Sequence, residues 1–407
     1  MVHRLPMNKY KILLLENIHP VAKETLDNAG FDVDVVTSSL SEEELCFKVG
    51  QYQALGIRSK TQITSKVLKN HGALFAIGAF CIGTNQIALE TANEYGLPVF
   101  NAPYSNTRSV AELIICELIA LSRQVSERSS KAHQGIWSKS AVGSREVRGK
   151  TLGIVGYGHI GSQVSVLAES LGLKVLFYDI IKKLPLGNAC AVESLDYLIR
   201  ESDFVTLHVP ETPLTKVMIG YEELCKMKKG SYLLNASRGT VVKIEDLVAA
   251  LNSGHIGGAA IDVFPEEPVN NEEPFSSPLQ GKPNVILTPH VGGSTEEAQA
   301  AIGSEVADSL IRFLTLGCTS GAVNFPHLDI PPSKGSRRLI NVHRNVPGVL
   351  RDITRIVSNY GANIFAQYLS TDNNIGYLIM DMEQGAAEQV ADEVRQLPTA
   401  IKTRVLF

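Results

Sequence analysis

Short apolar runs alternate with amphipathic segments along the first part of the chain. The runs that predict β-strands cover residues 11–15, 32–36, 54–58, 74–77 and 98–101, and segments with helical spacing separate them. This alternation is typical of a doubly wound sheet of parallel strands. A long helix is predicted from Thr107 to about Ser130, with Asn106 placed to cap it.

A second alternating series follows the long helix. Its predicted strands cover residues 151–155, 174–178, 204–209, 232–235, 259–263 and 285–288. Six strands with helices between them are what a dinucleotide-binding domain requires. Another helical pattern covers residues 295–316, and we expect it to return to the first domain, which would make that domain discontinuous.

The last part of the chain has a different pattern. Residues 317–335 contain Pro326, Pro331 and Pro332, which disfavour regular structure and predict a linker. The order strand, helix, strand, strand, helix, strand then follows, and it describes a small ferredoxin-like sandwich. These predicted elements cover residues 339–343, 349–360, 363–369, 376–382, 386–397 and 403–407.

The predicted fold is therefore α/β, with two doubly wound parallel-sheet domains and a C-terminal βαββαβ unit. We expect a discontinuous flavodoxin-like substrate-binding domain from residues 1–106 and 296–316, and a Rossmann domain from residues 107–295. A linker at residues 317–336 would lead to a regulatory domain at residues 337–407.

Composition narrows the kinds of partner that the chain would have. It has 407 residues, of which 44% are apolar and 20% charged, as in a soluble protein too long for one core. The net charge of −4 offers no basic field for nucleic acid or an anionic membrane. Residues 12–15 are too short an apolar run for a signal peptide, so a cytoplasmic location is expected.

The cysteines show no metal-binding or disulfide pattern. They are Cys46, Cys81, Cys116, Cys190, Cys225 and Cys318, and none forms a C-x-x-C pair. Because most lie among apolar neighbours, we expect reduced core residues and no metal site. A disulfide framework or a zinc site is the alternative, but no ligand spacing supports it.

A glycine-rich turn, Gly156-Tyr157-Gly158-His159-Ile160-Gly161, lies between a predicted strand and a predicted helix. The first glycine allows the tight turn, the second lets the backbone approach a pyrophosphate, and the third lets the helix pack on its strand. The strand and helix around the motif favour a dinucleotide site over a chance match. Asp179 ends the next strand and can accept hydrogen bonds from ribose hydroxyls. A ribose phosphate would be repelled there, which favours NAD over NADP.

Three residues at or after strand ends have the chemistry of a hydroxy-acid dehydrogenase. Arg238 follows an apolar strand, where a guanidinium can grip a carboxylate and polarise the C2 oxygen. His290 follows another strand and titrates near neutrality, so it can exchange the hydroxyl proton. Glu267 would orient and stabilise the imidazolium. Its neighbour Glu266 is the alternative partner, which geometry must decide.

The combined motifs resemble the D-2-hydroxyacid dehydrogenase family. The residues that carry the resemblance are Asp262 to Pro265 with Glu267-Pro268, Asn235 to Gly239, and Thr288 to His290 with Gly292 to Ser294. Residues 82–85 and 101–108 and the C-terminal unit narrow it to bacterial-type members with a C-terminal ACT domain. The resemblance covers nearly the whole chain from Lys11 to Phe407.

This resemblance implies NAD-dependent oxidation of 3-phospho-D-glycerate to 3-phosphohydroxypyruvate, the first step of L-serine biosynthesis. It implies cofactor contacts from Gly156, Gly158, His159, Ile160, Gly161, Asp179, His208, Pro210, Thr215, Ala236, Ser237, Arg238, Asp262 and Gly293. It implies substrate contacts from Arg58, Ser59, Lys60, Asn106, Arg238 and His290. Some family members have a second arginine where this chain has Lys60, which keeps the charge but loses the bidentate fork.

The resemblance also implies regulation and assembly. In serine-inhibited relatives, His343, Asn345 and Asn363 would bind L-serine between paired ACT domains. An ACT domain that only dimerises is the alternative. By resemblance we expect a homotetramer. Trp137 would contribute to an interface or pack inside one subunit.

Two other functions fit parts of the pattern. Arg238 recognises any 2-oxo acid, so a reductase of 2-oxoglutarate or hydroxypyruvate could use the same three residues. A nucleotide-sensing regulatory protein on a dehydrogenase scaffold is a second alternative. The presence of Arg238, Glu267 and His290 together disfavours it.

Overall fold

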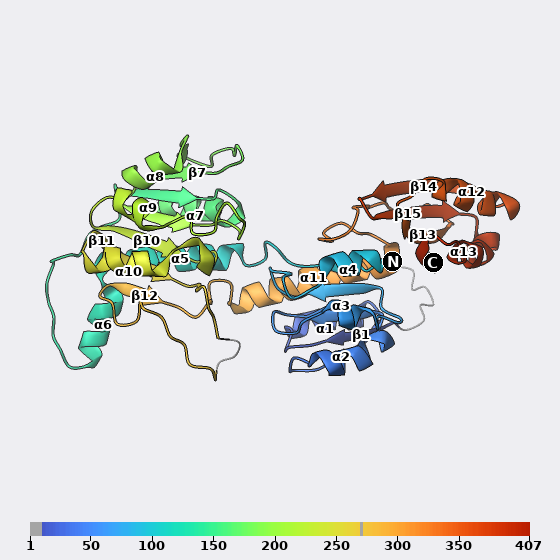
Figure 1. Cartoon of the computed structure of the whole chain (residues 1–407), viewed down its shortest axis with the longest axis horizontal. Coiled ribbons are helices and arrows are strands. Elements are labelled where there is room, and N and C mark those ends of the chain that lie inside the picture. The colour runs from blue at the N-terminus through green and yellow to red at the C-terminus, as the bar shows by residue number, and fades with distance from the viewer. Residues whose placement is uncertain (1–9, 269–271) are drawn as a thin grey trace. The chain divides into compact units, whose positions relative to one another are not determined.

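The structure is a computed structural model that describes residues 10–268 and 272–407. The chain divides into two compact units, one containing residues up to Ser105 and from Gln299 onward, the other Asn106 to Ala298. Within the described residues the strands form sheets of five, seven and four strands. Figure 1 labels their elements. The predicted fold class is confirmed.

The first sheet is parallel and has the strand order β2-β1-β3-β4-β5. Its strands β3 and β4 are buried along their whole length, as expected where helices cover both faces. Its strands are β1 (Lys11–Leu14), β2 (Asp32–Val35), β3 (Ala54–Ile57), β4 (Ala76–Ala79) and β5 (Val99–Phe100). The helices are α1 (Pro20–Asn28), α2 (Glu42–Lys48), η1 (Val49–Gln51), α3 (Ser65–Leu68) and α4 (Leu89–Glu94).

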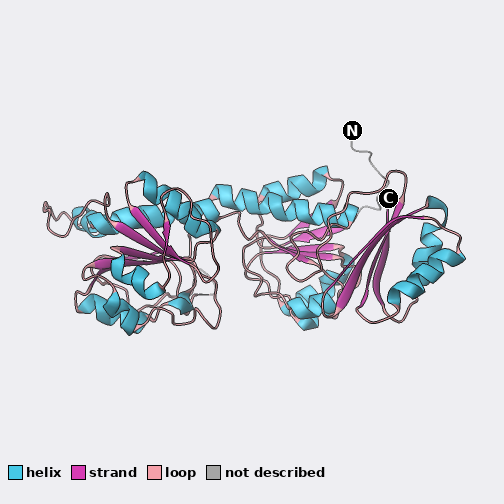
Figure 2. Ribbon diagram, turned by 90° about the horizontal axis from the view of Figure 1, so that it is seen from above, coloured by secondary structure: helices cyan, strands magenta, loops and turns pink. Residues whose placement is uncertain are grey.

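The second sheet is parallel with the order β12-β11-β10-β9-β6-β7-β8, and Figure 2 shows helices on both of its faces. Its strands are β6 (Thr151–Val155), β7 (Lys174–Tyr178), β8 (Cys190–Ala191), β9 (Phe204–Leu207), β10 (Ser231–Asn235), β11 (Ile256–Ile261) and β12 (Val285–Leu287). Its helices are α5 (Thr107–Arg123), α6 (Val125–His133), α7 (His159–Ser170), α8 (Leu195–Glu201), α9 (Tyr221–Lys226), η2 (Gly239–Val241) and α10 (Ile244–Asn252). Because β6 pairs with both β7 and β9, the strand order reverses there, and ligands bind at such a reversal.

The third sheet is antiparallel, with the order β14-β15-β13-β16. Its strands are β13 (Arg337–Arg344), β14 (Ile364–Thr371), β15 (Ile375–Met382) and β16 (Ala400–Leu406), and its helices are α12 (Val349–Asn359), η3 (Gln384–Ala386) and α13 (Ala387–Arg395). Helix α11 (Glu296–Leu316) precedes it, and residues 317–336 between them contain no helix or strand.

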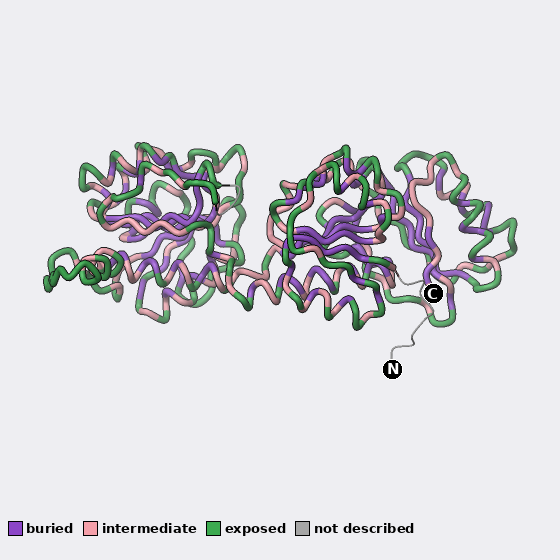
Figure 3. Tube along the Cα trace, turned by 90° about the horizontal axis from the view of Figure 1, so that it is seen from below, coloured by how far each residue is buried: buried purple, intermediate pink, exposed green. Residues whose placement is uncertain are grey.

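Both faces of this sheet are apolar, and they belong to different cores. Leu339 of β13 packs with the apolar faces of α12 and α13. Its neighbours Ile340 and Val342 instead join a core that includes Phe313 of α11 and Phe100 of β5. Alternation along a strand puts successive side chains on opposite faces, so a single strand serves both cores. Figure 3 shows the buried strands of all three sheets.

One buried ion pair fixes the start of the third sheet. Arg338 and Asp381 are 0% and 1% exposed and form two parallel hydrogen bonds of 2.7 and 2.9 Å. The remaining guanidinium hydrogens donate to the carbonyls of Leu316, Ile330 and Pro331. These bonds compensate the desolvation of the pair, and they tie residues 317–336 to the sheet.

Several sequence expectations were wrong in detail. The helix predicted from Thr107 to about Ser130 is interrupted at Gln124, whose φ of 55° is left-handed, so it forms α5 and α6. Asn106 lies at the start of α5, but its side chain makes no capping hydrogen bond. The described part of the second sheet has a seventh strand, β8, which is only two residues long and has too short a pattern to predict.

The cysteines are free, but the expectation that they lie in the core was wrong for three of them. Cys116, Cys190 and Cys225 are exposed, and Cys318 is buried. No group of metal-ligating side chains is present among the described residues. In the same residues, no helix has the length and apolar character needed to cross a membrane.

Candidate active site

The side chains of His290 and Glu267 form a hydrogen-bonded pair. His290 follows β12, and its Nδ1 lies 2.8 Å from Oε2 of Glu267. The other carboxylate oxygen accepts the backbone N–H of Phe264 at 3.0 Å, which orients Glu267. No hydrogen bond joins His290 to Glu266, which is exposed, in the described part of the chain.

The pair shifts both pKa values in favour of its charged form. The hydrogen bond that His290 donates to Glu267 raises the pKa of His290 above its ordinary value, against the smaller effect of desolvation. Burial acts to raise the pKa of Glu267, but its bonds to His290 and Phe264 outweigh burial and lower it. The positive charge of Arg238 acts to lower both pKa values, so the guanidinium lies within electrostatic reach of the pair.

Asp262 holds the backbone that carries His290. Its carboxylate accepts the Thr288 hydroxyl at 2.6 Å and the backbone N–H groups of Val291 and Gly292 at 2.9 Å each. Its carbonyl accepts the N–H of His290 at 2.8 Å. His290 itself has a left-handed φ of 53°, which a non-glycine residue adopts only when its surroundings enforce it. The Asp262 network supplies that enforcement.

Arg238 lies at the end of β10 in a turn fixed by Asn235. The Asn235 side chain donates to the Arg238 carbonyl at 3.0 Å and accepts both the N–H and the hydroxyl of Ser237. Gly239 follows, where an added Cβ would collide with the backbone of Phe264. The missing side chain therefore lets the turn after β10 approach the turn after β11.

A cavity of about 570 Å³ borders the pair. Phe264, Phe275 and Leu287 give it an apolar wall, and Glu267 and His290 supply polar groups. A mostly apolar hollow with a few convergent polar groups is typical of a small-molecule site.

The glycine-rich turn has the shape that a dinucleotide pyrophosphate requires. A Cβ on Gly156 would collide with the His208 carbonyl, and one on Gly161 would collide with the Gly156 carbonyl. Gly158 has open space around it and lies at the N-terminus of α7, whose first residues are His159 and Ile160. The backbone is thus open on the side where a helix N-terminus favours an anion, so the residues fit NAD.

Asp179 is bound to the same turn. Its carboxylate accepts the N–H of Tyr157 at 2.8 Å and that of Ile181 at 2.9 Å. The sequence predicted ribose contacts for this carboxylate. The structure adds a second role, because Asp179 also joins the end of β7 to the glycine-rich turn.

The other candidate cofactor residues lie at the ends of neighbouring strands. Burial lowers the pKa of His208 to about 3, so its imidazole is neutral, and its Nε2 lies 3.0 Å from the Thr206 hydroxyl. The Thr215 hydroxyl donates to the Pro210 carbonyl at 2.6 Å and closes the turn after β9. Ala236 follows β10, and Gly293 lies where an added Cβ would collide with the Asn106 side chain.

The predicted substrate residues Arg58, Ser59 and Lys60 follow β3 in the other unit. Ser59 and Lys60 are exposed, and Arg58 is half-buried. Their turn is anchored by Glu16, whose carboxylate accepts backbone N–H groups of Arg58, Lys60 and Thr61. The sequence analysis missed Glu16. A carboxylate directly after an apolar strand was the available signal.

The candidate serine residues lie in different surroundings. His343 is 3% exposed, burial lowers its pKa, and its Nδ1 lies 2.8 Å from Oδ1 of Asn341. Asn345 and Asn363 are exposed, and the Asn345 amide donates to the Asp372 carbonyl. Among the residues described, no hydrogen bond joins these three side chains to one another.

Glu117 is a second carboxylate that the sequence analysis missed. It lies on the buried face of α5 between Ile114 and Leu118, and it is 3% exposed. Neither carboxylate oxygen has a partner at hydrogen-bonding distance within the described residues. Burial, reinforced by the charge of Asp262, raises the pKa of Glu117 to about 8, against a smaller opposite effect of the Thr288 hydroxyl, which donates its hydrogen bond to Asp262. The sequence did carry a signal for Glu117, because it occupies a position in a helical pattern whose other positions are mostly apolar.

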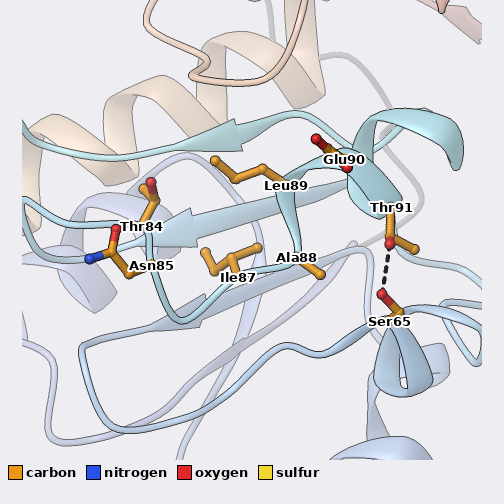
Figure 4. Close-up of a pocket in the computed structure, with 8 residues that line it drawn as sticks. All are labelled: Ser65, Thr84, Asn85, Ile87, Ala88, Leu89, Glu90 and Thr91. Carbon is orange, nitrogen blue, oxygen red and sulfur yellow. Dashed lines mark hydrogen bonds between the residues drawn. The ribbon is translucent and has the colours of Figure 1, made fainter. Parts of the chain in front are cut away.

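A second cavity, of about 350 Å³, lies in the unit that contains the first sheet (Figure 4). Ser65 and Thr91, whose hydroxyls are 2.7 Å apart, line it together with Thr84 and Asn85. None of the candidate catalytic or substrate residues lines this cavity. We therefore assign it no role in the chemistry.

Comparison with known proteins identifies the class. Residues 115–292 match the model of the D-isomer specific 2-hydroxyacid dehydrogenase, NAD binding domain, and residues 339–402 match an AHAS small subunit-like ACT domain. A D-lactate dehydrogenase from Aquifex aeolicus, solved with NAD and lactic acid, has a TM-score of 0.63 and 28% identity. That match covers 74% of this chain and 95% of the other. The chain belongs to the D-2-hydroxyacid dehydrogenase family.

Relatives that match along the whole chain narrow this class. The D-3-phosphoglycerate dehydrogenase of Dictyostelium discoideum is 53% identical over 402 residues, 99% of this chain and 98% of the relative. The Escherichia coli (strain K12) enzyme of the same name is 51% identical over 406 residues, 99% of each chain. Within the family, the chain groups with the D-3-phosphoglycerate dehydrogenases.

Replacing Glu267 tests the proton-transfer pair. Glu267→Gln removes the charge that raises the pKa of His290, so the acid limb of kcat/KM for hydroxy-acid oxidation should move to lower pH. kcat should fall about 100-fold, because the imidazolium loses its stabilising partner. The pH profile of initial rates measures both effects. Glu266→Gln is the matched control, and a larger effect from it would refute the assignment of Glu267.

Replacing Glu117 tests its buried proton. Because its folded pKa of about 8 exceeds the ordinary value of 4.5, the folded state keeps a proton that the unfolded state loses. The free energy of unfolding should therefore fall as the pH rises from about 4.5 to about 8, by up to about 5 kcal/mol. Glu117→Gln should remove this loss, as measured by denaturant unfolding across that range.

The control for this measurement is Glu112→Gln, on the same helix but exposed and paired with Arg108. It should keep the wild-type dependence on pH. Parallel curves for Glu117→Gln and the wild-type protein would show that Glu117 ionises normally in the fold.

Proposed function

We propose that the chain catalyses the NAD-dependent oxidation of 3-phospho-D-glycerate to 3-phosphohydroxypyruvate, the first step of L-serine biosynthesis. The observation that carries the proposal is the hydrogen bond between His290 and Glu267 within reach of the charge of Arg238. The names of the full-length relatives support this substrate over other 2-hydroxy acids.

The hydrogen bond supports Nε2 of His290 as the proton-transfer atom. Nδ1 of His290 donates to Glu267, so in the neutral ring Nε2 carries the lone pair. Nε2 therefore accepts the C2 hydroxyl proton during oxidation, and Glu267 stabilises the imidazolium that forms. NAD, when bound, supplies the acceptor for the C2 hydride. Its pyrophosphate would lie against Gly156, Gly158 and Gly161.

The substrate has two anionic groups, a carboxylate and a phosphate, and different cationic side chains would bind each of them. Arg238 would bind the C1 carboxylate and polarise the C2 oxygen, because its fork matches a carboxylate. Arg58, Ser59 and Lys60 would bind the phosphate, and Asn106 would add a polar contact. Lys60 supplies a point charge in place of a bidentate fork.

Regulation and assembly complete the proposal. L-serine would act as a feedback inhibitor through His343, Asn345 and Asn363, since the third sheet matches an ACT domain. A cytoplasmic homotetramer is the expected assembly. Strand β14 is an edge strand with Phe365, Tyr368 and Leu369 exposed, and pairing between copies would cover it.

A substrate panel tests the reaction. Purified protein with NAD and 3-phospho-D-glycerate should produce NADH, and Lys60→Ala should raise KM for this substrate about tenfold by removing a phosphate contact. Hydroxypyruvate and 2-oxoglutarate with NADH form the comparison. If the protein reduces hydroxypyruvate or 2-oxoglutarate but does not oxidise 3-phospho-D-glycerate, the reductase alternative replaces the proposal. No turnover of any substrate would favour a nucleotide sensor.

Serine control is tested by calorimetric titration of the whole protein with L-serine. Binding should be measurable and should weaken at least about tenfold in Asn345→Ala, which loses a polar contact to the amino acid. Asn359→Ala, at the end of α12, serves as the control. A wild-type titration without heat would leave the ACT domain a purely structural module.

A further inference from the structure

Glu16 is a buried carboxylate that binds the turn after β3 from the inside. It lies two residues after β1 and is 7% exposed. One oxygen accepts the N–H of Arg58 at 3.2 Å and that of Thr61 at 2.7 Å, and the other accepts the N–H of Lys60 at 2.9 Å. Three backbone N–H groups of the turn thus converge on one side chain.

These bonds decide how the turn can bind an anion. Backbone N–H groups gathered in one turn form a concave site that binds anions by itself. Here that site is occupied by the chain's own carboxylate. Binding of an external phosphate therefore depends on the side chains of Arg58 and Lys60. The bonds to Glu16 fix the backbone from which these two side chains extend.

A second side chain, that of Gln86, also binds the backbone of Arg58. The Gln86 amide donates to the Arg58 carbonyl at 2.7 Å. Glu16 itself has a left-handed φ of 63°, and its N–H donates to the Ser38 carbonyl at 3.2 Å. A left-handed residue that is nevertheless a glutamate indicates that its side chain is needed at this point.

We propose that Glu16 is a positioning residue for phosphate recognition, and that it orients Arg58 and Lys60 through their backbone without touching the substrate. This inference rests on the function proposed above. Two effects of Glu16 oppose each other. Its negative charge lowers the local positive potential and weakens anion binding, whereas its hydrogen bonds hold the two cations in place. We infer that positioning outweighs charge.

The opposed effects make Glu16→Gln decisive, because they predict opposite signs. The amide keeps the shape but cannot accept three N–H bonds as two carboxylate oxygens do, so KM for 3-phospho-D-glycerate should rise about tenfold. kcat should stay within about twofold, since His290 and Glu267 are untouched. The dissociation constant of NADH, from fluorescence titration, should not change. A KM that is unchanged or lower overturns the proposal.

Two further variants separate the loss of positioning from the loss of a negative charge. Glu42→Gln removes a half-buried carboxylate of the same unit, bound to Thr64 and Lys66, and should leave KM unchanged. Gln86→Leu keeps the charge of Glu16 but removes the second anchor, so KM should again rise severalfold. If Glu16→Gln does not fold, Gln86→Leu decides, and a normal KM there overturns the proposal.

The outcomes separate this inference from the proposed function. Absence of wild-type turnover with 3-phospho-D-glycerate removes the function, and the inference falls with it. Normal wild-type turnover with an unchanged KM in Glu16→Gln removes the inference alone. A loss of NADH affinity equal to the rise in KM would show general damage to the fold and would also overturn it.

Discussion

Acidic side chains just beyond parallel strands, accepting backbone N–H groups, are the interaction on which the candidate sites depend. Glu16 follows β1, Asp179 follows β7 and Asp262 follows β11, and each accepts at least two backbone N–H groups from a turn. Hydrogen bonds to an ionised acceptor are stronger than neutral ones, so a single carboxylate can fix several peptides. The turns fixed in this way carry Arg58 and Lys60, the glycine-rich turn and His290, which are the proposed phosphate, pyrophosphate and proton-transfer groups.

This arrangement explains how loops can be rigid enough for catalysis. A turn has few backbone partners of its own, and a strained residue such as His290 would relax without external support. Asp262 supplies that support with bonds to residues 288, 291 and 292. Glu117 lies behind it as a carboxylic acid whose raised pKa keeps it uncharged near neutral pH. An uncharged Glu117 does not repel the neighbouring carboxylate of Asp262.

The sequence predicted the elements well where the pattern was long and the chemistry local. The parallel strands, the glycine-rich turn and the third sheet followed from periodicity and spacing, because each depends on near neighbours. The break at Gln124 was missed because neither glycine nor proline stands there, and a left-handed residue leaves no mark when it is not glycine. The sequence also did not settle which of Glu266 and Glu267 pairs with His290, because the two neighbours differ only in the direction in which their side chains point. Glu16 and Glu117 each stood out locally as an acidic residue in or after an apolar pattern, but the residues they act on are far away in the chain, and the local pattern does not reveal those.

The two-sided third sheet has a consequence for how the protein could be divided. Ile340, Val342 and Tyr377 complete a core that Phe313 and Phe325 cannot close by themselves. The Tyr377 hydroxyl and the Arg338 guanidinium also bind carbonyls at the end of α11 and just after it. A protein truncated before Arg337 would therefore expose the apolar side chains of this core, Phe313 and Phe325 among them, to solvent. The C-terminal segment that matches an ACT domain thus completes a core that it shares with α11 and the first sheet.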